Sequence, residues 1–221
     1  MCFNYKVSLF TFFIGTVFSI LLIKYGNPRF FLENKTSGIF LIFISMIQFM
    51  DFLFWIDVKN KLGINTITTI LGPILNAFQP VIFYIIKYIY YQPDIFSFYN
   101  FPVFLLNVLY TIYFIIQYVT FLSKGPLITH VKNGHLSWPW IPYYNPLFYL
   151  ILLAINIFYL FKWTYGVTLF SITYFFLFLS VKYFSYHVGE LWCFFGSFIP
   201  LLLFFASFLL HLSTFQTPNF I

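Results

Sequence analysis

The chain has 221 residues, of which 62% are hydrophobic and 7% are charged, and its mean hydropathy is +0.91. Soluble globular domains are roughly 45–50% apolar, so this composition excludes a soluble domain and predicts an integral membrane protein. The net charge of +6 comes from 11 basic and 5 acidic residues. In a membrane protein such residues fix orientation and bind lipid headgroups. Without a basic soluble domain, no nucleic-acid partner is expected.

Seven apolar runs are long enough to cross a bilayer, because about 20 residues span roughly 30 Å of hydrocarbon. The start, "MCFNYK", leads directly into the first run without a small-residue cleavage site, so we expect the first helix to remain as a signal anchor. Gly, Pro, Asn and charged residues separate the runs. We predict an all-α, polytopic fold, a single seven-transmembrane-helix domain over residues 1–221. The expected spans are about 7–23, 38–56, 64–90, 101–123, 146–162, 167–185 and 190–212.

Seven spans place the N-terminus and the connections after the second, fourth and sixth spans on one side of the membrane, which we call the near face. The connection at 124–145 is polar and broken by prolines, so we expect it to be a lid and not a span. Its stretch "WPWIPYYNP" should lie against the mouth of the bundle, because Trp and Tyr prefer the membrane interface.

Basic residues in the connections hardly distinguish the two faces of the membrane. Three basic residues follow the first span and one precedes it, which favours an extracytosolic N-terminus. The tripeptide "NKT" at Asn34 to Thr36 is an N-glycosylation pattern on the far face and favours the reverse orientation. The near-face set is Lys6, Lys59, Lys61, Lys124, Lys132 and Lys182, and the far-face set is Lys24, Arg29, Lys35, Lys87 and Lys162.

Polar side chains recur at helical spacing inside four of the spans, and such residues usually face the interior of a bundle. Asp51 is the only acid well inside a span, and a carboxyl at that depth is either neutral or paired. We expect Gln117 and Thr69 at the depth of Asp51, whereas Gln79 and Asn107 should meet about 22–24 Å below the near face. The predicted ligand-binding seam consists of Gln48, Asp51, Thr69, Asn76, Gln79, Gln117, Glu190 and Cys193.

Packing alone is an alternative reading of this seam, because hydrogen bonds between spans stabilise bundles by about 0.6 kcal/mol each. The chain would then be a structural membrane protein. A stripe of small residues on the first span is also typical of close helix packing and consists of Thr11, Gly15 and Ser19. Prolines are expected to kink the third span at Pro73 and Pro80 and the seventh at Pro200.

Histidine, cysteine and acidic residues gather near the predicted near face, which raises the alternative of a membrane-embedded metal- or thiol-dependent hydrolase. A metal site needs three or four such ligands that converge, and the spacing here matches no specific motif. The metal-ligating candidates are His130, His135 and His187. Cys2 and Cys193 share the near face, so they can form a disulfide in an oxidising compartment. No particular cofactor is indicated.

Several short stretches resemble a seven-helix membrane family that has a "MCFS"-like N-terminus, occurs in bacteria and large DNA viruses, and has no assigned activity. They are "MCFNYKVSLFTFFIG", "QFMDFLFW", "LNAFQP", "GHLSW" and "GELWCFF", in order along the whole chain. The family pattern usually has Glu where Asp51 stands and often His where Ala77 stands, so this chain has a shorter acid and one ligand fewer. The resemblance implies the fold and the membrane location.

We therefore expect a bundle that binds or passes a small solute or ion through the polar seam, with Asp51 as the ionisable site and the 124–145 connection as a lid. The expected partners are the lipid bilayer and that solute or ion. The sequence indicates neither an oligomeric state nor a particular membrane.

Overall fold

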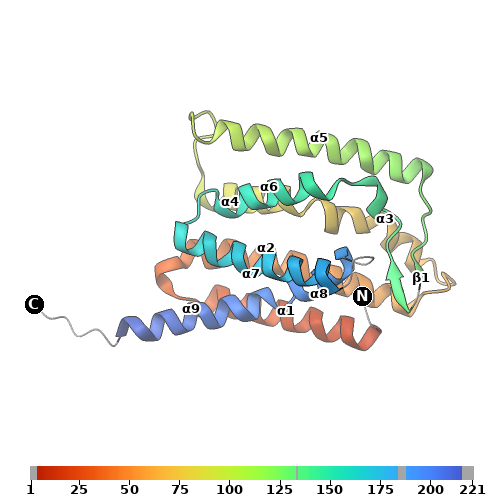
Figure 1. Cartoon of the computed structure of the whole chain (residues 1–221), viewed down its shortest axis with the longest axis horizontal. Coiled ribbons are helices and arrows are strands. Elements are labelled where there is room, and N and C mark those ends of the chain that lie inside the picture. Colours follow the sequence, from red (N-terminus) through yellow and green to blue (C-terminus); the bar gives the residue numbers. More distant parts are fainter. Residues whose placement is uncertain (1–3, 133, 184–187, 216–221) are drawn as a thin grey trace, which may run out of the picture.

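The computed structural model describes residues 4–132, 134–183 and 188–215, with the backbone alone at 189–190 and 208–215. Helices dominate the described chain, and the longest of them lie side by side (Figure 1), as the apolar runs predict. In chain order the elements are α1 (Tyr5–Tyr25), η1 (Pro28–Phe30), α2 (Phe31–Ile56), α3 (Ile64–Ala77), α4 (Gln79–Tyr91), α5 (Phe101–Lys124), β1 (His130–Lys132), β2 (His135–Ser137), η2 (Ile141–Tyr143), α6 (Pro146–Phe158), α7 (Trp163–Tyr183), α8 (Val188–Gly196) and α9 (Ile199–Phe215).

Four of the described helical segments are long and apolar enough to cross a membrane, namely α1, η1 with α2, α5 and α7. The pair α3 and α4 meets the same criteria together, with a bend of 61° between them, which raises the number to five. Shorter apolar helices are α6 and the stretch Leu191–Ser207. The all-α, multi-pass character is therefore confirmed, whereas three of the seven predicted spans are broken or short.

Prolines explain the two breaks. Phe78 separates α3 from α4 and is followed at once by Gln79 and Pro80. In the same way, α8 ends at Gly196 and α9 begins just before Pro200. A proline lacks the N–H that continues a helix and crowds the preceding turn, so each helix restarts at the proline. The bend of 61° confirms the predicted kink at Pro80, the helix is interrupted just before Pro200, and Pro73 lies inside α3 without interrupting it.

Small residues bring α1 and α2 into close contact. Thr11 and Ser19 on α1 are buried, and a Cβ added to Gly15 would lie 2.1 Å from the Ser45 hydroxyl oxygen on α2. Any larger side chain at Gly15 would force the two helices apart. This confirms the predicted packing role of the small-residue stripe.

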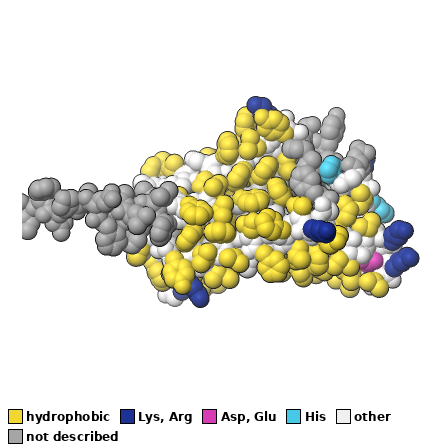
Figure 2. Space-filling model, turned by 90° about the horizontal axis from the view of Figure 1, so that it is seen from below, with side chains coloured by type: hydrophobic (Ala, Val, Ile, Leu, Met, Phe, Trp, Pro, Cys, Tyr) yellow, Lys and Arg dark blue, Asp and Glu magenta, His cyan; other side chains and the backbone are white. Residues whose placement is uncertain are grey.

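The outer surface is mainly apolar, as a protein in lipid requires. Figure 2 shows a face covered mostly by hydrophobic side chains. Helix α5 lies at the edge of the bundle (Figure 1) and exposes Leu109, Ile112, Ile116 and Val119 along most of its length. Its buried side chains are Asn107, Tyr110, Phe114 and Phe121.

Candidate functional site

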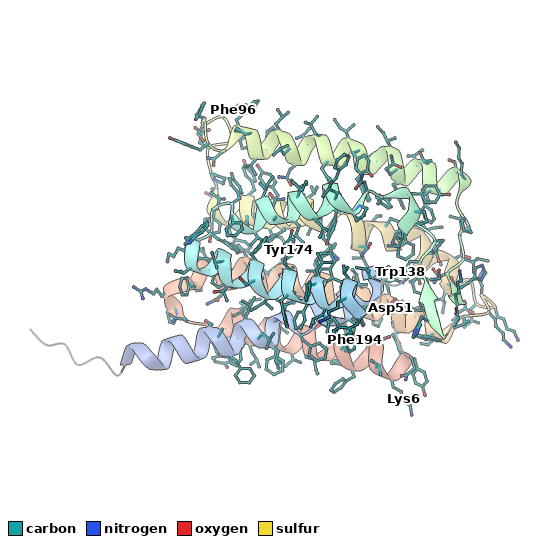
Figure 3. The ribbon with its side chains drawn as sticks, viewed as in Figure 1. Lys6, Asp51, Phe96, Trp138, Tyr174 and Phe194 are labelled. Atoms are coloured by element: carbon teal, nitrogen blue, oxygen red, sulfur yellow. The ribbon has the colours of Figure 1, made fainter. Side chains whose placement is uncertain are left out.

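Asp51 lies on α2 with none of its side chain exposed. The indole N–H of Trp138 donates a hydrogen bond of 3.2 Å to its carboxyl oxygen Oδ1. Trp138 is itself only 3% exposed, and Figure 3 shows the two side chains together in the interior of the bundle. An indole nitrogen can only donate, so the carboxyl group is the acceptor in this bond.

Trp138 reaches Asp51 because the 124–145 connection folds back into the bundle. A short hairpin of β1 and β2 pairs His130 with Ser137, and Gly134 at its tip has a φ of 76°. The chain then descends through Trp138 and Trp140, whose rings stack with centroids 5.2 Å apart. The prediction that this stretch lies against the mouth of the bundle is confirmed. The two indoles lie deeper than predicted, since both are buried.

Gly72 on α3 makes room for the second of these indoles. A Cβ at Gly72 would lie 2.3 Å from the nearest ring atom of Trp140, so only glycine fits beneath the ring. Phe54 of α2 and Phe121 of α5 also contact the Trp140 ring. The connection therefore closes the end of the bundle at which α2 and α5 end, with a plug of aromatic side chains.

Thr129 anchors the start of this plug to α3. Its backbone N–H donates to Asn65 Oδ1 (2.9 Å), and its carbonyl accepts from Asn65 Nδ2 (2.9 Å). Its hydroxyl lies 2.9 Å from the hydroxyl of Thr69, which also donates to Asn65 Oδ1 at 3.2 Å. The sequence predicts Thr69 at the depth of Asp51, and in the structure its hydroxyl group helps to hold the connection to α3.

Asp57 stabilises the loop between α2 and α3. Its two carboxyl oxygens accept hydrogen bonds from the backbone N–H groups of Lys61, Leu62, Ile64 and Asn65, at 2.7 to 3.3 Å. Burial raises the pKa of this carboxyl, but the four N–H donors outweigh it, so the pKa is lower than its ordinary value of 3.8. The sequence predicted Asp57 only as a boundary of the second span.

Gln48 lies one turn of α2 before Asp51 and is also buried. Its carbonyl oxygen accepts from the Thr11 hydroxyl of α1 at 2.9 Å. Its amide nitrogen has no hydrogen-bond partner among the described residues. Turning the amide over would only exchange which of its two polar atoms is unpaired. One polar atom of this buried amide, one helical turn from Asp51, is therefore left without a partner among the described residues.

Further along the seam, two polar pairs lie near the break between α3 and α4. Asn76 Nδ2 lies 3.6 Å from the sulfur of Cys193 on α8. Gln79 donates to the Leu75 carbonyl at 3.0 Å and accepts from the hydroxyl of Tyr149 on α6. A cavity of about 30 Å³, large enough to hold a water molecule, lies against Gln79, Tyr149 and Cys193.

The deepest predicted pair has different partners from those expected. Asn107 exchanges two amide hydrogen bonds with Asn156 of α6, at 3.1 and 2.9 Å, and Asn156 also donates to the Pro80 carbonyl at 2.9 Å. Gln79 pairs with Tyr149 and not with Asn107. Sequence reasoning missed Asn156 and Tyr149 because single polar residues in an apolar run form no stripe.

The inward face of α5 agrees with the prediction at Asn107, which is buried, and departs from it toward the end of the helix. Its inward side chains include Phe114, Phe121 and Tyr118, whose hydroxyl donates to the Ile70 carbonyl at 3.1 Å. Gln117 is only half-buried, one position away from this row. Polar residues defined the predicted stripe, but large aromatic residues fill the space beneath α5.

The metal-ligating candidates do not converge in the described part of the chain. No group of three His, Cys, Asp or Glu side chains that could hold a metal occurs among the described residues. His130 is exposed on β1, and His135 is half-buried on β2. His187, Cys2 and the side chain of Glu190 lie outside the described residues, so the predicted Cys2–Cys193 disulfide stays a prediction, and the Cys193 side chain is buried.

Two features assigned to the far-face connections are buried instead. Asn34 of the glycosylation pattern is 2% exposed on α2, and its amide donates to the Asn27 carbonyl at 3.0 Å. A glycan could not be attached to this amide in the folded protein. Lys87, counted above as a basic residue of a connection, has none of its side chain exposed and belongs to α4. Hydropathy did not predict the burial of Lys87, because a charged residue late in an apolar run usually marks the end of a span.

Comparisons of the chain with protein-family models, with curated proteins and with solved structures give no match.

Proposed function

We propose that this protein binds a small solute or ion in a membrane-embedded polar seam, with Asp51 as the ionisable residue of the site. The observation that carries the proposal is the buried hydrogen bond between Trp138 and Asp51. An acid inside a span is unfavourable, by up to a few kcal/mol, and such residues commonly mark ion, proton or solute sites. A packing role alone would not require a carboxyl group at this position.

The near-face connection is the gate of this site in our proposal. Trp138 and Trp140 cover Asp51 from the near-face side, and Thr129 holds their segment to α3. Outward movement of the plug would remove the indole donor from Asp51. A cation, a proton or a solute donor would then take its place on the carboxyl group.

Broken helices support a binding role for the rest of the seam. Membrane proteins tolerate interrupted helices where the freed backbone groups are buried in protein or line a cavity. Many transporters build their binding sites from such discontinuous helices. Here the breaks after α3 and α8 both adjoin the cavity beside Gln79, Cys193 and Ile199.

We also propose that the chain crosses the membrane seven times, with α3 and α4 as one bent span, α8 and α9 as another, and α6 as a short one. The 13 residues of α6 extend about 20 Å, so residues on either side of α6 complete the crossing. With this topology, the start of α1 and the β1–β2 hairpin lie at one end of the bundle, and the end of α9 lies at the other, as drawn in Figure 1.

The test compares the melting temperature of the wild type with that of Asp51→Asn between about pH 5 and pH 8, in Na⁺, K⁺, Ca²⁺ and Zn²⁺. Asn is nearly isosteric with Asp and keeps an oxygen acceptor for Trp138. We expect the melting temperature of the wild type to depend on pH or on the cation. The variant should fold, and its melting temperature should lack that dependence.

Asp94→Asn is the matched control, because Asp94 is an exposed acid of the loop between α4 and α5. It should keep the wild-type dependence. Superimposable curves for wild type and Asp51→Asn under all conditions would leave only the packing role for Asp51.

A further inference from the structure

Lys87 is a fully buried lysine in the far half of the bundle. Its Nζ donates hydrogen bonds to the backbone carbonyls of Asn156, Ile157 (3.2 Å) and Tyr159 (2.6 Å) at the end of α6. The ring of Phe161 lies on another side, with its centroid 3.4 Å from Nζ. A lysine buried this deeply is rare unless the structure provides dedicated partners for it.

These partners are those that suit a primary ammonium group. An ammonium has three N–H donors, and three carbonyl oxygens accept from Lys87, whereas a neutral amine has only two N–H groups. The last carbonyls of a helix have no intrahelical donor and carry partial negative charge. An aromatic face adds further attraction for a cation.

The same contacts hold the turn between α6 and α7. Leu160 in this turn has a φ of 64°, which is unfavourable for a residue with a branched side chain. Lys162 ties the far side of the turn to α2, since its backbone N–H donates to Glu33 Oε1 at 3.4 Å. Its Nζ also donates to the Arg29 carbonyl at 2.5 Å. Lys87 is thus the link between this turn and α4.

We propose that the end of α6 and the Phe161 ring form a binding site for a primary alkylammonium group, which the side chain of Lys87 fills from within the chain. Occupation of the site fixes the turn between α6 and α7 against α4. The site is defined by backbone carbonyls, so it persists when the lysine side chain is shortened. This proposal stands independently of any role of Asp51.

The test is chemical rescue of Lys87→Ala in the full-length protein. Truncation to Ala removes the ammonium and leaves a channel that n-propylammonium can fill. We expect the melting temperature of Lys87→Ala to fall by about 5 °C or more and to recover by at least half in millimolar n-propylammonium. 1-Propanol, which has the size but lacks the charge, and tetramethylammonium, which has the charge but lacks N–H donors, should not restore it.

Lys24→Ala is the matched control, because Lys24 is an exposed lysine in the last turn of α1. The melting temperature of Lys24→Ala should equal that of the wild type and should not change when n-propylammonium is added. If Lys87→Ala cannot be purified in folded form, n-propylammonium is added throughout purification, and recovery of folded protein becomes the measurement.

Lys87→Met provides a second variant, because Met fills the channel but has no N–H donor. It should be less stable than the wild type and should not respond to n-propylammonium. The proposal is overturned if Lys87→Met is as stable as the wild type. It is also overturned if n-propylammonium gives no recovery, or no more than 1-propanol gives.

Discussion

At the scale of single residues, the chain places ionisable side chains where burial demands a specific partner. Asp51 receives the indole N–H of Trp138, and Lys87 donates to three carbonyls at the end of α6. Asp57 is held by four backbone N–H groups outside the spans. The contacts of Asp51 and Lys87 join segments distant in sequence, whereas those of Asp57 fix the loop that follows it.

Trp138→Phe should isolate the contribution of the indole N–H, because Phe keeps an aromatic ring in the plug. We expect the variant to fold and to lose about 1–2 kcal/mol of stability, since a buried carboxyl loses its donor. Thermal unfolding of Trp138→Phe in the wild-type and Asp51→Leu backgrounds measures the coupling between the two residues, because Leu is close to Asp in size but has no acceptor. Trp163→Phe is the control, because Trp163 is 72% exposed. Equal losses in the two backgrounds would argue against a bond that depends on the carboxyl group.

Asp57 should make stability depend on pH in the acidic range. Its pKa is lower in the folded protein than the ordinary value of 3.8, so the folded state favours the ionised form. The stabilisation is therefore complete above that ordinary value and is lost as the pH falls through the folded pKa. Thermal unfolding of wild type and Asp57→Asn should show the largest difference near neutral pH, and the two should converge as the pH falls below 3.8 and through the folded pKa. A difference independent of pH would contradict this account.

At the scale of elements, the sequence predicts helices better than it predicts what they face. The spacing of Gln48 and Asp51 correctly places both in the interior, because polar residues in a span avoid lipid. On α5 the same reasoning predicts that Gln117 faces inward, whereas Tyr118 and Phe121 do so in the structure. Packing of these large rings stabilises the bundle more than burial of one polar group would. Trp138 and Asp51 are 87 residues apart, and no local pattern encodes a contact across that separation.

Gly72→Ala should weaken the seating of the plug on α3. The added methyl group would overlap the ring of Trp140, which is packed on several sides and cannot move freely. We expect a lower melting temperature and faster proteolysis within 130–145. Gly196→Ala is the control, since a Cβ there would meet Ile44 at an ordinary 3.5 Å. Unchanged proteolysis in Gly72→Ala would mean that the plug is not held by this contact.

At the scale of the whole molecule, separate buried polar contacts occur in several parts of the bundle. They involve Asp51, Asn76, Gln79, Asn156 and Lys87. Composition and hydropathy predicted the membrane class and the helical fold. The breaks at Pro80 and Pro200 were also predicted. The hydrogen-bond partners of the seam residues were not predicted, because they depend on which helices become neighbours.

The proposed topology can be tested with single cysteines in a background without Cys2 and Cys193. Exposed positions at Lys61 and Lys132 should react with an impermeant thiol reagent from one side of the membrane. Asp94→Cys should react from the opposite side. Labelling of all three from the same side would contradict the seven-pass arrangement and the near face defined by it.

An experimental density map around the Asp51 carboxyl group tests the central claim most directly. The protein should be imaged in the cation and at the pH that raise its melting temperature most. We predict non-protein density within hydrogen-bonding or coordination distance of Asp51, together with displacement of the Trp138 indole. A map in which Asp51 contacts only protein atoms under every stabilising condition would contradict a binding site at this residue.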